Sequence, residues 1–166
     1  MKLSLISICL LFLSYGCSND SPTSTAPTEP TLDITAKTHE GYTWPIRRWD
    51  GDNWIDTGDK LTVSWTWRFI SHLERDDGGV LIKGGYTLEL SNPSDNDVEF
   101  RLNKFFFKDK DGIPIYEYTF YDIERLVSAN GTARYSGTFE IDLDNIDIAN
   151  QITEMTLWAS ATIPVE

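Results

Sequence analysis

The stretch Leu61-Thr62-Val63-Ser64-Trp65-Thr66-Trp67-Arg68-Phe69 places an apolar residue at every odd position and a polar residue at every even one. Successive side chains of a β-strand point to opposite faces, so this period of two predicts a strand with one buried and one solvated face. Trp65 and Trp67 share the apolar phase with Val63 and Phe69. The pattern therefore predicts that both indoles lie in the core.

The same alternation returns along the rest of the chain. It is present at residues 86–90, 98–102, 133–143 and 155–163. The phase slips at Lys104, before three consecutive phenylalanines, which indicates either a β-bulge or a bend. In the last run Trp158 falls on the outward phase, where it is either exposed or covered by a second layer.

Turn residues separate these runs at regular intervals, as in DKDG at 109–112 and NG at 130–131. Helical spacing is weak everywhere, and we expect one helical turn at most, at residues 123–127. Residues 71–79, SHLERDDGG, are typical of a loop. Together the runs predict an all-β fold: a single immunoglobulin-like β-sandwich of about seven to nine antiparallel strands, spanning residues 32–166.

Charge restricts the possible partners. The chain carries a formal net charge of -12, and a protein this acidic gains nothing from binding a polyanion, so we expect no nucleic-acid partner. One basic cluster stands out against this background, formed by Arg101, Lys104, Lys108 and Lys110. We interpret it as a solvated strand end and turn, in preference to an anion site.

The N-terminus has the pattern of a secretory leader. Met1 and Lys2 form a short positive segment, and residues 3–13 are apolar but too few to span a bilayer as a helix. The following LSYGC, residues 13–17, resembles the lipobox of bacterial lipoproteins, with Gly16 just before Cys17. It departs from that motif in having Ser14 where leucine is preferred, and a bulky Tyr15.

The lipobox resemblance implies that residues 1–16 are a signal peptide and that the Cys17 thiol is acylated, with palmitate as an expected chain. The alternative is an ordinary cleaved signal that releases a free secreted product. The other cysteine, Cys9, lies inside the leader, so the mature domain would have no intramolecular disulfide.

A short tether is expected between the lipid and the domain. Residues 17–31 comprise Cys17 and a segment rich in Ser, Thr and Pro, a composition that is typical of disorder. We therefore expect a membrane partner through the lipid on Cys17 and a lipid-anchored place in the cell envelope. Ser18 next to the cysteine favours the outer membrane, as the lipoprotein resemblance implies.

Two further segments carry a family resemblance. Residues 87–112, TLELSNPSDNDVEFRLNKFFFKDKDG, and residues 125–141, RLVSANGTARYSGTFEI, resemble the FxLYD-like and related immunoglobulin-like domains of bacterial surface proteins. The resemblance covers about half of the chain and departs from the family at Tyr121 and Asp122. It implies a binding, spacer or assembly module without enzyme activity, and it transfers no functional residues.

Catalytic and metal motifs are weak. The sequence has two histidines, His39 and His72, on unrelated segments, and neither lies in a nucleophile or zinc motif. We expect no catalytic residues, no cofactor and no metal. One oxygen-rich cluster comprises Asp50, Asp52, Asn53 and Asp56, followed by Asp59. Such oxygens suit calcium, but their spacing does not match an EF-hand loop.

A hairpin explains that cluster more simply. Trp49 and Trp54 flank the sequence DGDN, so their indoles would pack across two paired strands while Asp, Gly and Asn shape the turn. Trp44, Trp49 and Trp54 are the candidate ligand-binding residues, with core packing as the alternative for each.

Two functions remain open at this point. The first is a non-enzymatic interaction or structural module at the cell envelope, whose partner is an envelope protein. The second is a carbohydrate-binding module of a cell-surface polysaccharide system. A planar row of exposed indoles would favour the glycan partner, and buried indoles would favour the protein.

Overall fold

The structure, a computed structural model, describes residues 31–165, except for the side chains of Tyr121 and Asp122. The expected signal peptide, the lipidated Cys17 and the tether up to residue 30 lie outside the described residues. Among the residues that are described, no helix combines the length and the apolar character needed to cross a bilayer.

Seven strands and one short helix make up the described chain. They are β1 (Lys37–Trp49), β2 (Trp54–Glu74), β3 (Val80–Ser91), β4 (Val98–Lys108), β5 (Pro114–Val127), β6 (Thr132–Leu143), α1 (Ile146–Gln151) and β7 (Glu154–Thr162). The prediction of an all-β domain with about seven to nine strands is confirmed.

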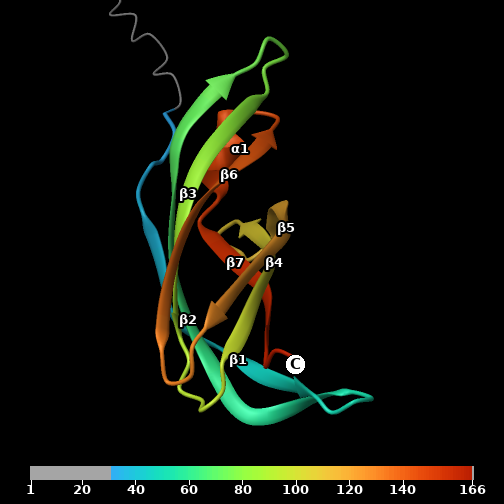
Figure 1. The fold of residues 1–166 in the computed structure, drawn as a ribbon. Coiled ribbons are helices and arrows are strands. Elements are labelled where there is room, and N and C mark those ends of the chain that lie inside the picture. The colour runs from blue at the N-terminus through green and yellow to red at the C-terminus, as the bar shows by residue number, and fades with distance from the viewer. Residues whose placement is uncertain (1–30, 166) are drawn as a thin grey trace, which may run out of the picture.

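All seven strands belong to one sheet, in the order β5-β4-β7-β1-β2-β3-β6. This sheet folds over so that the long, curved strands β1, β2, β3 and β6 form one layer and β4, β5 and β7 form the other (Figure 1). The edge strands β5 and β6 approach each other, and the Tyr135 hydroxyl on β6 donates to the Leu126 carbonyl on β5 at 3.1 Å. The result is sandwich-like and nearly closed into a barrel.

The connectivity within the layers is particular to this chain. Here β1, β2 and β3 follow one another in a single layer, whereas the second and third strands of an immunoglobulin constant-type domain lie in different sheets. One neighbouring pair also departs from the expected antiparallel pattern. Strands β1 and β7 run parallel, because β1 is oriented by its hairpin partner β2 and β7 by its antiparallel neighbour β4.

Aromatic side chains dominate the interior. Trp65 and Trp67 are 2% and 1% exposed, so the prediction that both indoles are core residues is confirmed. The Trp65 indole crosses the interior and its Nε1 donates to the carbonyl of Met155 on β7 at 2.9 Å. Phe69 and Phe107 pack edge to face against Trp67, an arrangement that aromatic pairs favour.

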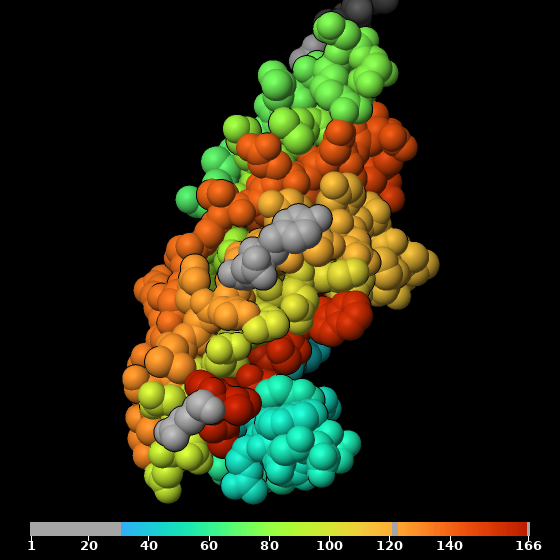
Figure 2. Space-filling model, turned by 45° about the vertical axis from the view of Figure 1, so that its right-hand side comes forward, coloured from blue at the N-terminus to red at the C-terminus, as the bar shows by residue number. Residues whose placement is uncertain are grey.

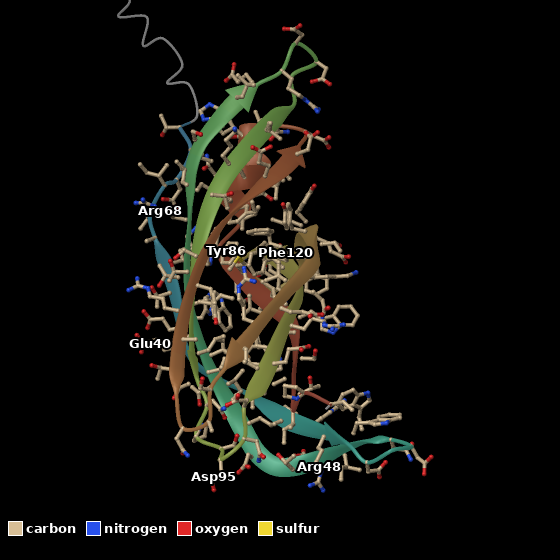
Figure 3. The ribbon with its side chains drawn as sticks, in the orientation of Figure 1. Glu40, Arg48, Arg68, Tyr86, Asp95 and Phe120 are labelled. Carbon is tan, nitrogen blue, oxygen red and sulfur yellow. The ribbon has the colours of Figure 1, made fainter. Side chains whose placement is uncertain are left out.

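Tyr86 and Phe120 meet between the layers, where β6 and β5 come near each other (Figure 3). Their ring centroids are 5.7 Å apart in an edge-to-face arrangement. Burial raises the pKa of the Tyr86 hydroxyl. Gly137 lies opposite Tyr86, and a Cβ there would come within 2.5 Å of the tyrosine oxygen, so a glycine is required for this ring to fit.

The phase slip in the sequence is a β-bulge. The register of β4 shifts between Leu102 and Lys104 against both neighbouring strands. Asn103 is the extra residue against β7, whereas the additional residues lie on β5 where β4 pairs with that strand. Before the bulge the inward side chains fall on even positions, and after it Phe105 and Phe107 fall on odd ones. The bulge therefore keeps both halves of β4 facing the core.

Two local predictions were wrong. Residues 123–127 lie in β5, and the helix is α1, whose first turn is capped by the Asn145 side chain accepting from the Ile148 N–H at 3.1 Å. Ile146 and Ala149, three positions apart, bury one face of this helix. The supposed loop around His72 instead extends β2 as a strand, with His72 paired to Ile82, and its exposed side chains hide the alternation.

The two buried tryptophans of β2 give a matched test of the interlayer hydrogen bond. Trp65→Phe leaves the Met155 carbonyl without its donor, whereas the Trp67 Nε1 has no partner among the described atoms. Both substitutions remove a similar volume from a buried site. We expect Trp65→Phe to lower the free energy of unfolding by about 1–2 kcal/mol more than Trp67→Phe does. Urea denaturation measures the difference, and equal losses would contradict the role assigned to this bond.

Candidate functional site

A hairpin arm projects from one end of the fold. It consists of residues 47–57, which belong to the end of β1 and the start of β2 (Figure 1). The register of β1 shifts between Pro45 and Arg47, and such irregularities bend a strand. At this bend the Thr57 hydroxyl donates to the Ile46 carbonyl at 2.9 Å. The described chain begins at the opposite end of the fold, so the arm points away from the N-terminal side.

Asp50 organises the turn at the tip of the arm. Its Oδ1 accepts from the backbone N–H groups of Asp52 at 2.9 Å and Asn53 at 2.8 Å, and these bonds hold the pKa of Asp50 below its usual range. Gly51 has a φ of 110°, a conformation that suits glycine. The hairpin interpretation of DGDN is confirmed.

A second carboxylate of the oxygen-rich cluster has a similar use. Asp56 Oδ1 accepts from the Gly58 N–H at 2.8 Å, so this carboxylate also shapes a turn. Within residues 31–165 no group of three or more His, Cys, Asp or Glu side chains is placed to hold a metal ion.

The three candidate tryptophans separate into two places. Trp49 and Trp54 pair across the arm, with ring centroids 5.5 Å apart and planes inclined by 59°. Their exposed fractions are 38% and 47%, so both indoles face solvent on at least one side. Trp44 lies nearer the body, half-buried against Trp65 and the edge of Phe100. The three indoles therefore form no common platform.

A groove runs along β7 between the base of the arm and the neighbouring strands. Strands β1 and β7 pair only at Ile46–Ala161 and Arg47–Thr162 and diverge beyond these residues. Two adjoining hollows of about 350 Å³ and 320 Å³ follow this divergence and share Arg47 and Ser160. We call them together the β7 groove. Figure 2 shows the arm as a lobe set apart from the rest of the molecule.

The β7 groove includes Trp158, which the sequence predicts to be either exposed or covered by a second layer. Trp158 is 55% exposed and lines the same hollow as Trp44. Its ring stacks on Phe106 of β4 with an interplanar angle of 18° and a centroid distance of 6.3 Å. The Lys104 ammonium lies 5.2 Å from the Trp158 ring centre. The outward phase of Trp158 was the signal that pointed to this surface.

Ion pairs neutralise most of the basic cluster on the strands beside the groove. Arg101 pairs with Glu99 at 3.4 Å and with Glu124, and Lys104 pairs with Glu117. Lys110, in the turn, pairs with Asp111 at 2.7 Å. These contacts are solvent-exposed, which confirms the interpretation as a solvated strand end and turn.

The two histidines lie far apart. His39 on β1 is opposite Trp65 and stacks on its indole with ring centroids 5.0 Å apart. His72 lies seven residues further along β2, roughly 20 Å away at about 3.3 Å per residue. The structure does not bring the histidines together, and His39 acts here as an aromatic packing partner.

A larger hollow lies elsewhere, on the outer face of the β1–β2–β3–β6 layer. It measures about 660 Å³ and is lined mainly by hydroxyls and by the loose pair of Arg134 and Glu89 at 3.6 Å. Threonine hydroxyls on this face bond to neighbouring hydroxyls, as between Thr38 and Thr66 at 3.0 Å. Threonine is a common residue on solvated strands, so this face has a structural explanation.

Comparison with known proteins adds little. No family model and no curated protein matches the chain. One similar solved structure is a Northeast Structural Genomics Consortium target, SoR45, with 15% identity and a TM-score of 0.39; the match covers 51% of this chain and 64% of that one. Another is a member of the DUF1425 family from Shewanella sp. pv-4, with 11% identity, a TM-score of 0.30 and coverage of 74% and 94%. Any functional assignment rests on this chain's own residues.

The Asp50 turn can be tested through the indole pair that it holds together. We expect Asp50→Ala to abolish the exciton-coupled circular dichroism of Trp49 and Trp54, because the turn loses both side-chain acceptor bonds. Asp52→Ala is the matched control and should preserve the signal.

Lowering the pH should abolish the exciton-coupled circular dichroism of Trp49 and Trp54, as Asp50→Ala does at neutral pH. The pKa of Asp50 is lower in the folded protein than in the unfolded chain. Its contribution to the stability of the turn is therefore complete above the unperturbed carboxyl pKa of about 3.9, and it is lost as the pH falls through the lower pKa of the folded state. If the exciton-coupled circular dichroism of Trp49 and Trp54 survives in Asp50→Ala at neutral pH, this explanation of the turn is wrong.

Proposed function

We propose that this protein is a non-enzymatic binding module of the cell envelope, anchored through a lipid on Cys17 and contacting an envelope protein through the tip of its arm. The observation that carries the proposal is the exposed indole pair of Trp49 and Trp54 on a projecting hairpin. Exposed tryptophans are enriched among the residues that dominate protein–protein binding energy. Solvated surfaces without a partner rarely carry two adjacent indoles.

The position of the arm supports the proposal. The described chain begins at one end of the fold, and the arm lies at the other (Figure 1). A lipid on Cys17 would hold the N-terminal end toward the bilayer, and the arm would then be directed away from it. The tip residues would meet partners at a distance from the membrane surface.

The arrangement of the tip indoles favours a protein partner there. Trp49 and Trp54 are inclined by 59°, so they present a ridge and not a flat surface. Trp44, the third candidate, is half-buried in the body of the domain. A ridge of this kind fits a pocket on a protein, whereas a sugar ring stacks on a flat face.

The lipid anchor has a direct test. Cys17→Ala should eliminate incorporation of labelled palmitate, because the thiol is the only acceptor that the lipobox resemblance provides. The altered chain should also leave the membrane fraction, since stable anchoring needs several acyl chains. Cys9→Ala serves as the matched control and should label normally. Palmitate labelling that persists in Cys17→Ala would refute the anchor.

The contact surface is tested by cross-linking in intact cells. A photoreactive benzoylphenylalanine at position 49 should give a discrete higher-mass adduct, and the same residue at position 73 should not. Leu73 is a fitting control because it is 64% exposed on the hairpin at the opposite end of the fold. Trp54→Ala should remove the adduct formed from position 49. An adduct that is unaffected by Trp54→Ala would rule out the indole pair as the contact.

A further inference from the structure

We propose that the β7 groove is a second binding site, separate from the tip of the arm, and that it takes an uncharged polysaccharide chain. The site is built from residues on four strands: Trp44 and Arg47 on β1, Trp54 on β2, Arg101 on β4, and Trp158 and Ser160 on β7. Trp49, the exposed tip residue, is not among the groove residues. Trp54 belongs to both the tip pair and the groove, whereas Trp158 and Arg47 line the groove and have no part in the tip contact.

Two indoles give the groove its apolar surfaces. Trp158 exposes 55% of its surface, and its orientation is fixed by the stacked Phe106 below it. Trp44 also lines the groove and packs against Trp65 and Phe100, so it is fixed before any ligand binds. Sugar rings present apolar C–H faces, and rigid indoles can pack against such faces with little loss of side-chain entropy.

Polar groups lie between these apolar surfaces. Arg47 is exposed, and no carboxylate of the described residues lies within 4.0 Å of its guanidinium, so its donors face solvent. The hydroxyls of Ser160 and Thr162 lie on the outer face of β7, opposite Arg101 and Glu99. Donors and acceptors side by side match the adjacent hydroxyl groups of a sugar, each of which both donates and accepts.

The charge of the groove favours an uncharged ligand. Arg101 is already paired with Glu99 and Glu124, and Arg47 is opposite Asp56 in the β1–β2 ladder. The whole chain has a net charge of -12, so a polyanion would be repelled before it reached the site. The groove therefore has one paired guanidinium and one that is unpaired among the described residues. This is too little positive charge to outweigh the net charge of the chain for an acidic polymer, and neutral hydroxyl groups can hydrogen-bond to both guanidinium groups.

The shape of the groove fits a chain better than a single small molecule. Each hollow, at about 350 Å³ or 320 Å³, is near the lower limit for ligand pockets. The two hollows join end to end along β7, through Arg47 and Ser160. A glycan could place one unit beside Trp54 and others beside Trp158 while passing Arg47.

Affinity electrophoresis tests this inference directly. The mature domain is run through native gels that contain dextran, mannan, soluble starch or hydroxyethylcellulose, and polygalacturonate is the acidic comparison. We expect at least one neutral polymer to retard the protein and polygalacturonate to leave its mobility unchanged. Trp158→Ala and Arg47→Gln should each raise the dissociation constant at least about five-fold.

Matched variants separate the groove from general surface effects. Arg48→Gln changes the neighbouring arginine, which points to the other side of the arm (Figure 3), and Leu73→Ala truncates an exposed apolar side chain on the far hairpin. Both variants should bind the neutral polymer as tightly as the unaltered protein does. Thermal melts check that each variant is folded, and Trp158→Phe should retain part of the binding if Trp158→Ala is unstable.

Three results would overturn the proposal. Retardation by none of the neutral polymers would remove the ligand class. Stronger retardation by polygalacturonate, suppressed by salt, would make the groove an anion site. Retardation that is insensitive to both Trp158→Ala and Arg47→Gln would place the glycan elsewhere.

Discussion

The contact between the two layers is the interaction on which the rest of the structure depends. Trp65 reaches from the long layer to the short one, where its Nε1–H satisfies the Met155 carbonyl inside an apolar interior. A buried carbonyl without a donor is costly, so this bond favours the observed placement of β2 over β7. The surrounding rings fill the remaining space. The backbone pairing of β7 with β4 and, at two positions, with β1 completes its placement, and the β7 groove opens where the pairing with β1 ends.

Much of the fold was readable from side-chain alternation because burial and period coincide in the central strands. Residues 61–69 predicted Trp65 and Trp67 in the core, and the phase slip at Lys104 marked the bulge at Asn103. Strand order was not readable, since alternation gives a strand its inner face but not its neighbours. The end of β2 was missed for a similar reason, because side chains on both faces there are exposed.

The candidate site was predictable only in part. The flanking tryptophans and the DGDN turn identified the arm because a hairpin is a local structure whose signals lie close together in sequence. The β7 groove joins residues more than a hundred positions apart, such as Trp44 and Trp158. Its existence depends on where β1 and β7 stop pairing, which no local pattern encodes. Likewise, the sequence grouped Trp44 with Trp49 and Trp54, but the bend before Arg47 separates them.

The course of β1 also bears on how the domain would carry mechanical load. This strand begins near the N-terminal end of the described chain and ends in the arm. Tension between an anchored N-terminus and a partner held at the tip would run along β1 from one end to the other. Both points of attachment lie at the ends of this one strand, so its covalent backbone would carry the load. The remaining strands would stay paired to β1 without transmitting the force.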